Sequence, residues 1–268
     1  MKHTKQHARN IRIKVLEMIH QARASHIGGC FSIADILAVL YTEILKFNPK
    51  KPEWPDRDRL ILSKGHAAAA LYATLSEFDF FSAKKLETFC KKNSALTGHC
   101  NYKVPGVEVS TGSLGHGLSL ACGMALAAKA QRRKYRVFVI LSDGEMDEGS
   151  TMEAALFAPH HKLDNLVTII DYNKIQSFGL VKTVLNLEPL ADKWRAFNWG
   201  VQSINGHNHA EIFSALSTLP LKKDRPSVVI ANTIKGKGVS YMENSLAWHY
   251  RSPDDPLFQQ ALKELEQS

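Results

Sequence analysis

Short apolar runs that alternate with helical segments constrain the fold of this chain more than any other feature. The runs are rich in β-branched residues and cover residues 59–63, 136–141, 166–170, 201–204 and 227–231. Between them, apolar residues recur at helical spacing. Strands that alternate with helices predict an α/β fold, with a mostly parallel sheet flanked by helices on both faces. No apolar stretch approaches the length of a bilayer-spanning helix, so we expect no membrane segment.

The chain is expected to form a single domain over residues 1–268. Its composition is 44% hydrophobic, enough for a full core, and no low-complexity or proline-rich stretch divides it. Ser32, followed by an acid at Asp35, predicts the capped start of a second helix. Residues from Pro256 onward predict a short amphipathic C-terminal helix. The four cysteines match neither a zinc site nor a redox pair, so we expect reduced packing residues in a cytoplasmic protein.

Two polar residues follow neighbouring strands of the predicted sheet. Asp143 comes after the run 136–141, Asn173 comes after the run 166–170, and one helix joins these strands. Such a crossover places parallel strands side by side, so the two side chains should lie close together at the carboxyl edge, where ligands bind. A carboxylate and an amide oxygen suit Mg²⁺ or Ca²⁺, with coordination positions left for a diphosphate. A plain turn at Asp143-Gly144 is the alternative that the pair alone leaves open.

Glycines and histidines cluster in further loops. Residues 112–117, Gly-Ser-Leu-Gly-His-Gly, precede a helix rich in alanine and leucine, where backbone amides can approach an anion. The segment matches neither the dinucleotide fingerprint nor a P-loop. His26, His66, His99 and His249 lie in loops near predicted strand ends. A lone loop histidine is usually only solvated or hydrogen-bonded, but four in such positions indicate a shared site.

Five motifs, taken in order, carry a family resemblance. They are Ser63-Lys64-Gly65-His66-Ala67, Thr97-Gly98-His99, the run from Gly106 to Gly117, Asp143-Gly144-Glu145 with Glu148-Gly149, and Asp171-Tyr172-Asn173-Lys174-Ile175. Together they resemble the transketolases over residues 11–252, in the N-terminal, diphosphate-binding domain of that family. The resemblance implies the thiamine diphosphate-binding fold. It also implies transfer of a two-carbon ketol unit from a ketose phosphate to an aldose acceptor.

The resemblance implies roles for individual residues as well. The family's metal ligands correspond to Asp143, Asn173 and the carbonyl of Ile175, which includes the pair indicated by the topology. Its cofactor contacts correspond to His66, Gly112, Ser113, Leu114, Asp143, Gly144, Asn173 and His249.

Four residues correspond to catalytic positions of the family. His26 and His99 are similar to residues that bind the sugar hydroxyls and move protons, a role suited to an imidazole with a pKa near neutrality. His249 is similar to a histidine that touches both the diphosphate and the substrate. Glu148 resembles an acid that links the two cofactor sites of the dimer.

The resemblance also implies a partner. The family's pyrimidine-binding domain, which activates the cofactor ring, has no counterpart in this sequence, so we expect the N-terminal subunit of a split transketolase. Such a subunit would act on sugar phosphates only with a C-terminal subunit, in an α2β2 assembly. Two positions depart from the family pattern: Ser142 stands where the family usually has glycine, and Ile27 where it usually has proline.

Two other functions fit parts of the sequence. The first keeps the cofactor but changes the reaction, to that of a 2-oxo acid dehydrogenase α subunit or a deoxyxylulose phosphate synthase-like enzyme. His66 and His99 in their glycine contexts favour a transketolase. The second is a basic nucleic-acid-binding module, suggested by a net charge of +8. The chain lacks interleaved aromatic residues and a helix-turn-helix pattern, so we expect no nucleic-acid partner.

Overall fold

The computed structural model describes residues 2–267 and contains a five-stranded sheet. The strand order is β1-β2-β3-β7-β6, and every neighbouring pair is parallel. The strands are β1 (Arg59–Leu62), β2 (Val137–Ser142), β3 (Leu166–Tyr172), β7 (Ser227–Asn232) and β6 (Gly200–Asn205). Each strand matches a predicted apolar run to within two residues at either end. The predicted α/β fold with a mostly parallel sheet is therefore confirmed.

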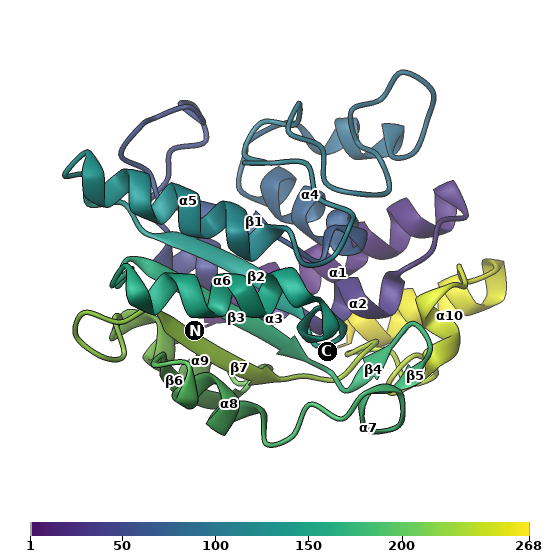
Figure 1. Ribbon diagram of the computed structural model, residues 1–268. Coiled ribbons are helices and arrows are strands. Elements are labelled where there is room, and N and C mark those ends of the chain that lie inside the picture. The colour runs from purple at the N-terminus through teal and green to yellow at the C-terminus, as the bar shows by residue number, and fades with distance from the viewer. Residues whose placement is uncertain (1, 268) are drawn as a thin grey trace.

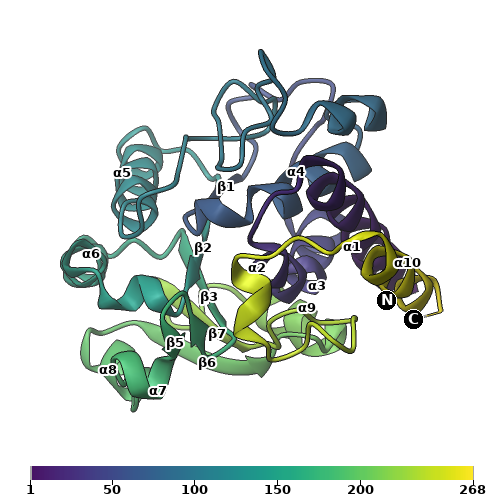
Figure 2. The ribbon, with the colours of Figure 1, turned by 90° about the vertical axis from the view of Figure 1, so that its right-hand side faces the viewer.

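Helices cover both faces of this sheet (Figure 1, Figure 2). One layer consists of α5 (Gly117–Ala130), α6 (Gly149–His160) and α8 (Leu190–Ala196). The opposite layer consists of α1 (Lys2–Ala22), α2 (Ile27–Ser32), α3 (Ala34–Val39), α4 (Ala68–Glu77) and α9 (His209–Ser217), with α10 (Asp255–Glu266) packed on α1. The shorter elements are η1 (Leu40–Ile44), η2 (Gly65–Ala67), η3 (Ala83–Thr88), η4 (Gly144–Asp147), η5 (Leu246–His249), α7 (Val181–Val184) and the hairpin of β4 (Ile175–Gln176) with β5 (Gly179–Leu180).

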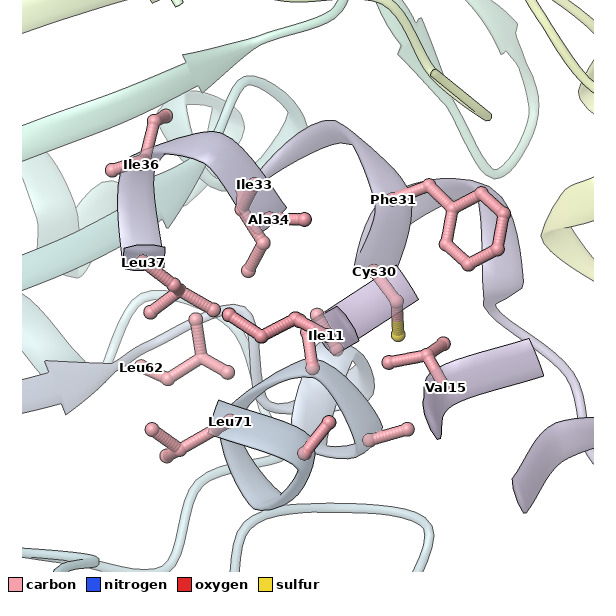
Figure 3. Close-up of a cluster of buried hydrophobic side chains, with 14 of the residues drawn as sticks. Ile11, Val15, Cys30, Phe31, Ile33, Ala34, Ile36, Leu37, Leu62 and Leu71 are labelled. Atoms are coloured by element: carbon pink, nitrogen blue, oxygen red, sulfur yellow. The ribbon is translucent and has the colours of Figure 1, made fainter. Parts of the chain in front are cut away.

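The sheet divides the hydrophobic core into two clusters. Consecutive residues of a strand point to opposite faces, so Phe138 and Ile140 of β2 pack under the α1 layer while Val137 and Val139 pack under α5 and α6. Figure 3 shows the first cluster, in which side chains from α1, α2, α3 and α4 converge beside Leu62 of β1. Strands that are apolar on both faces are typical of a parallel sheet covered on both sides.

The parallel register brings the carboxyl ends of the strands to one edge of the sheet. Ser142 at the end of β2 pairs with Asp171 in β3, which in turn pairs with Ala231 in β7. The loops that follow β1, β2, β3 and β7 therefore leave from the same edge. Among the residues that the structure describes, no helix combines the length and apolar character needed to cross a bilayer.

Two local predictions need correction. Ser32 does not cap a helix: α2 ends at Ser32, α3 begins at Ala34, and no side chain caps α3. The Ser32 hydroxyl instead donates to the carbonyl of Gly29 at 3.0 Å and to Asp171 Oδ2 at 2.7 Å. The hydroxyl thus bonds the preceding turn of α2 and a distant carboxylate, and not the backbone N–H groups at the start of α3. All four cysteines are free, but Cys90 is exposed, so the packing role fits only the other three.

Candidate active site

A pocket of about 430 Å³ lies at the carboxyl edge of the sheet. Segments that follow β1, β2, β3 and β7 line it, together with the turn before α2. The predicted site residues that line the pocket are His26, His66, His99, Gly112, Leu114, Asp143, Gly144, Glu148, Asn173, Ile175 and His249. Ser113 is exposed and does not line it, although both of its chain neighbours do. Residues far apart in the sequence therefore share one pocket.

Four histidine rings form a cluster in this pocket. The ring centroid of His26 lies 5.2 Å from that of His66, 6.0 Å from that of His99 and 5.1 Å from that of His249. The backbone N–H of His26 donates to the carbonyl of His249 at 2.9 Å, and φ of His26 is 73°, in the left-handed region. Non-glycine residues in that region are uncommon and concentrate at functional sites. The strained turn before α2 thus holds His26 beside the other three rings.

Burial and nearby positive charge keep two of these rings neutral. Loss of hydration, reinforced by the charges of His99, Lys235 and Lys64, lowers the pKa of His26 to about 4. Loss of hydration and the Lys235 charge lower the pKa of His249 to about 3. The expectation of a near-neutral pKa is therefore wrong for His26. At pH 7 each of these two imidazoles offers one hydrogen-bond donor and one acceptor.

We expect the rings of His26 and His249 to stay neutral from about pH 5.5 to pH 8, because their lowered pKa values lie below that range. Ring chemical shifts in an NMR titration of the histidine-labelled chain would measure this, with His26→Gln and His249→Gln variants for assignment. A titration midpoint above pH 6 for either ring would contradict the described environment.

Asp143, Asn173 and Ile175 line the pocket beside the histidines, and each can offer an oxygen donor: a carboxylate, an amide oxygen and a backbone carbonyl. Asp143 and Asn173 follow the neighbouring strands β2 and β3, and both are buried where they line the pocket. The Asp143 carboxylate accepts the backbone N–H of Lys174 at 2.6 Å, and Asn173 Oδ1 accepts the backbone N–H of Ile175 at 3.2 Å. The first bond ties the segment after β3 to the end of β2, and the second is a local turn within that segment. The structure thus places Asp143 and Asn173 in one pocket, at the ends of neighbouring strands.

Lys235 brings a positive charge to the same donors. Its ammonium donates to the carbonyl of Ile175 at 2.9 Å and lies 3.0 Å from Nδ1 of His249. Burial lowers the pKa of Lys235 to about 8, so this side chain is charged at pH 7. Burial, followed by the charge of Asp171, raises the pKa of Asp143 to about 6. Burial disfavours the ionised Asp143 carboxylate, and a cation bound beside it would offset that cost.

A buried ion pair joins Lys64 to Asp171 behind these donors. Both side chains are fully buried, at 1% and 0% exposed. Ser32 and Thr233 donate their hydroxyls to Asp171, and the Asn173 amide donates to it at 3.0 Å. Burial alone would raise the pKa of Asp171, but the Lys64 ammonium and these hydrogen bonds lower it overall. The network ties α2, β1 and β3 together and orients the Asn173 side chain toward the pocket.

Replacing Lys64 by methionine should lower the free energy of unfolding by about 3–5 kcal/mol, because the Asp171 carboxylate would stay buried without its counter-ion. Urea denaturation followed by circular dichroism would measure this. Lys129→Met is the matched control: its pair with Asp164 is about one-third exposed, and its loss should cost less than about 1 kcal/mol. Equal losses in the two variants would contradict a structural role for the buried pair.

A third buried acid, Glu145, positions the glycine segment. Its carboxylate accepts the Ser63 hydroxyl, the backbone N–H of Gly115 at 2.8 Å and the backbone N–H of Ser142 at 3.3 Å. A Cβ atom at Gly117 would collide with Ser63, so this close approach requires glycine. The Ser142 hydroxyl is buried at the pocket and has no partner among the described residues, which leaves it available to a ligand.

Reasoning from the sequence missed Lys64, Glu145, Asp171 and Lys235 as members of the site. Lys64 and Asp171 stand within the motifs that carry the resemblance, and both lie at the ends of apolar strands that reach the same edge of a sheet. Opposite charges at the ends of two such strands predict a buried ion pair between them. Lys235 follows β7 in the same way and could have been found by the same argument.

A family model described as the thiamine diphosphate binding domain of transketolase matches residues 3–264. The chain belongs to the transketolase family. Among its relatives in this family, the 6-deoxy-6-sulfo-D-fructose transketolase subunit SqwG of Clostridium sp. (strain MSTE9) is 44% identical over 263 residues, which are 97% of this chain and 96% of the relative. One subunit of the apulose-4-phosphate transketolase of Phocaeicola vulgatus is 41% identical over 256 residues, 96% of this chain and 91% of that subunit.

Solved transketolases share the fold. The transketolase of Campylobacter jejuni matches 99% of this transketolase-family chain with a TM-score of 0.93 and 33% identity, and the match covers 43% of that structure. A Pichia stipitis transketolase in complex with sedoheptulose 7-phosphate gives a TM-score of 0.93 at 26% identity, over 99% of this chain and 41% of that structure. The chain thus spans less than half of these solved transketolases, but nearly all of the two subunits above.

Proposed function

We propose that this transketolase-family chain is the thiamine diphosphate-binding subunit of a split transketolase. In this proposal residues 1–268 form a single diphosphate-binding domain. The enzyme moves a two-carbon ketol unit from a ketose phosphate to an aldose acceptor. One observation carries the proposal: the same pocket combines three oxygen donors suited to a metal with a cluster of four histidines. The match to the family's thiamine diphosphate binding domain supports the cofactor.

The residues at the pocket fit a metal-bound diphosphate. Asp143, Asn173 and the carbonyl of Ile175 would hold Mg²⁺ or Ca²⁺, since all three are oxygen donors and only one is charged. The ammonium of Lys235 already lies against the Ile175 carbonyl as a cation and would also attract a diphosphate. The unpartnered Ser142 hydroxyl adds one more group for a ligand. When bound, thiamine diphosphate supplies the carbon nucleophile of the reaction.

The diphosphate and ring contacts are proposed for residues around these ligands. They are His66, Gly112, Ser113, Leu114, Gly144 and His249. The Lys235 ammonium donates to Nδ1 of His249, so the neutral ring carries its proton on Nε2 and can donate it to an oxygen. The ring centroid of His66 lies 5.2 Å from that of His26 and 5.8 Å from that of His249. Burial lowers the pKa of His66 well below its usual value, which suits contact with the cofactor better than proton exchange with solvent.

The substrate is proposed to meet His26 and His99. Both rings also line a neighbouring pocket of about 380 Å³, together with Arg23 and Tyr250. A neutral imidazole can accept a proton from one sugar hydroxyl and donate to another, which is what ketol transfer requires of the protein. We propose sugar phosphates as substrates. The two subunit relatives bear names with different sugars, so the sugar itself follows from neither.

The partner in this proposal is a C-terminal transketolase subunit with a pyrimidine-binding domain, in an α2β2 assembly. Relatives that match nearly end to end are themselves named as subunits of transketolases, which supports a second polypeptide. Large apolar side chains are also exposed, among them Phe178 at 84%, which lines the pocket, Leu185 at 54% and Leu156 of α6 at 60%. Glu148, an exposed residue at the pocket and the start of α6, would link the two cofactor sites of the assembly.

We also propose a cytoplasmic location, in keeping with four free cysteines.

A choice of donor substrate tests the reaction class. The chain, combined with its companion subunit, thiamine diphosphate and Mg²⁺, would be given either a ketose phosphate or pyruvate together with an aldose phosphate. The proposal expects a chain-extended ketose phosphate from the first donor, and release of the shortened aldose phosphate. Turnover of pyruvate without turnover of the ketose phosphate would point to a 2-oxo acid enzyme instead.

A further inference from the structure

A second cavity, of about 500 Å³, lies away from the pocket described above. The first half of α1, the start of α9, the loop after β7 and the end of α10 line it. Figure 2 shows α1 and α10 packed along one another at this side of the molecule. The cavity shares no lining residue with the candidate active site, so a ligand here would be a separate one.

Positive charge dominates the cavity. Among the described residues, the charged side chains that line it are Lys2, Lys5, Arg9, Arg12, Lys237 and a single acid, Asp35. The four basic residues of α1 follow at intervals of three, four and three, which puts them on one face of a helix. Like charges at such intervals repel one another. The first turn of α1 contains no acid to offset them, although the start of a helix is itself electropositive.

Nearby acids offset only part of this surplus: Glu243 pairs with Lys237 at 3.0 Å, and Asp35 pairs with Arg12. Asp35 is buried, and Arg12 donates to both of its oxygens, at 3.1 and 2.6 Å. His207 and His209 also contact the Asp35 carboxylate, at 2.7 and 3.0 Å. Its hydrogen-bonding capacity is therefore taken up by neighbours from α1 and from the start of α9. Lys2 and Lys5 are exposed and take part in no ion pair among the described residues.

One buried donor at the cavity lacks an acceptor. Arg12 is only 7% exposed; its two terminal nitrogens donate to Asp35 and to the carbonyl of Phe31, but its Nε has no partner among the described residues. Buried N–H groups are nearly always paired, so this one calls for an explanation. Gly238 faces it: φ there is +98°, and a Cβ atom would lie 3.7 Å from the Arg12 Nε. Gly238 therefore packs closely against the Arg12 side chain, which lines the cavity with its Nε still lacking an acceptor among the described residues.

We propose that this cavity binds a small polyanion with two or more phosphate-like groups. Guanidinium and ammonium groups from α1 and from the loop after β7 match such a ligand, and Arg12, whose Nε lacks an acceptor in the described part of the chain, lines the same cavity. Within residues 2–267, no phenylalanine, tyrosine or tryptophan lines the cavity, so it offers no large ring on which a nucleobase could stack. A phosphorylated metabolite without a base is therefore the ligand class that fits. The proposal does not depend on the catalytic role of the other pocket.

Calorimetric titration of the full chain with inorganic tripolyphosphate tests the proposal. EDTA in the buffer would suppress metal-dependent binding at the other pocket. Lys5→Gln combined with Arg9→Gln removes two charges that are not buried, so the fold should survive, whereas Arg12 variants would also break its pair with Asp35. The matched control is Lys92→Gln combined with Arg132→Gln, which removes the same charge from exposed residues outside the cavity.

The proposal expects one tripolyphosphate per wild-type chain and a Kd at least about tenfold higher in the Lys5→Gln, Arg9→Gln variant, since each charge-assisted contact contributes strongly. The control variant should bind within about twofold of the wild type. Equal weakening in both variants would mean that only overall charge attracts the anion, and would overturn the site. Absence of measurable binding to the wild type at millimolar tripolyphosphate would also overturn it.

Discussion

Asp143→Ala is expected to abolish magnesium-dependent binding of thiamine diphosphate, with a loss of affinity of about 100-fold or more. Asp143 is the only charged donor of the proposed metal set, and the remaining donors, Asn173 and the Ile175 carbonyl, are neutral oxygens. Without the carboxylate, the site loses most of its attraction for a divalent cation. The cation would otherwise offset the charge of the diphosphate.

The fold should survive this change. The pKa of Asp143 is raised to about 6 by burial and by the charge of Asp171, so the carboxylate, although mostly ionised at pH 7, is less stable in the folded chain than in the unfolded one. Removing the carboxylate therefore takes away no favourable ion pair, but it leaves the backbone N–H of Lys174 without its acceptor. These two effects oppose each other, so the variant should keep a cooperative thermal transition close to that of the wild type.

Calorimetry with thiamine diphosphate and Mg²⁺ on the assembled enzyme would measure the effect. Asp147→Ala serves as the control, because Asp147 also lines the pocket but bonds to Gln176 at 2.8 Å and belongs to no proposed metal ligand set. The control should keep most of the affinity. An equal loss of cofactor affinity in both variants would mean that Asp143 acts only through the overall charge of the pocket. Unchanged cofactor affinity in Asp143→Ala would contradict its assignment as a metal ligand.

His26→Ala and His249→Ala should each lower kcat by about 10² to 10⁴, the range in which proton-transfer groups contribute, while cofactor affinity changes far less. Both rings line the pocket, and both are neutral at pH 7, so each can take or give a proton at a sugar hydroxyl. His66→Ala should instead weaken binding of the cofactor, since burial keeps that ring neutral and His66 is the histidine proposed to contact the cofactor alone.

Steady-state kinetics and cofactor titration of the three variants would separate these roles. The backbone N–H of His26 anchors the turn before α2 through the carbonyl of His249, and alanine retains both groups. The variants therefore test the rings and leave the turn intact. An equal loss of cofactor from all three variants would contradict the division of roles.

The sheet and the pairing of Asp143 with Asn173 were predictable because they depend on local pattern and topology. β-branched runs specify strands, and one helix between two strands makes them parallel neighbours. The side chains that follow those strands then lie at the same edge of the sheet, and this placement does not depend on how the rest of the chain packs. This is why Asp143 and Asn173, the two proposed metal donors at these strand ends, could be placed together before any three-dimensional arrangement was known.

The electrostatics of the site could not be predicted, because they depend on contacts between distant segments. Ser32 fits a helix cap by its neighbours in sequence, yet its hydroxyl bonds Asp171, 139 positions away. The pKa of His26 falls because water is displaced from its ring and because basic side chains from separate loops share its surroundings. A sequence shows the residue type at each position, but it does not show which charges fold around it.

The central claim, that this chain works only as part of a split transketolase, is tested most directly by reconstitution. Ketol transfer from a ketose phosphate to an aldose phosphate would be assayed with the purified chain, thiamine diphosphate and Mg²⁺, while the companion subunit is titrated in. Light scattering would follow the mass of the assembly. The account predicts no turnover by the chain alone, and activity that rises with added companion to a plateau at one companion per chain, with the mass of an α2β2 complex. Full turnover by the single chain without a second polypeptide would contradict it.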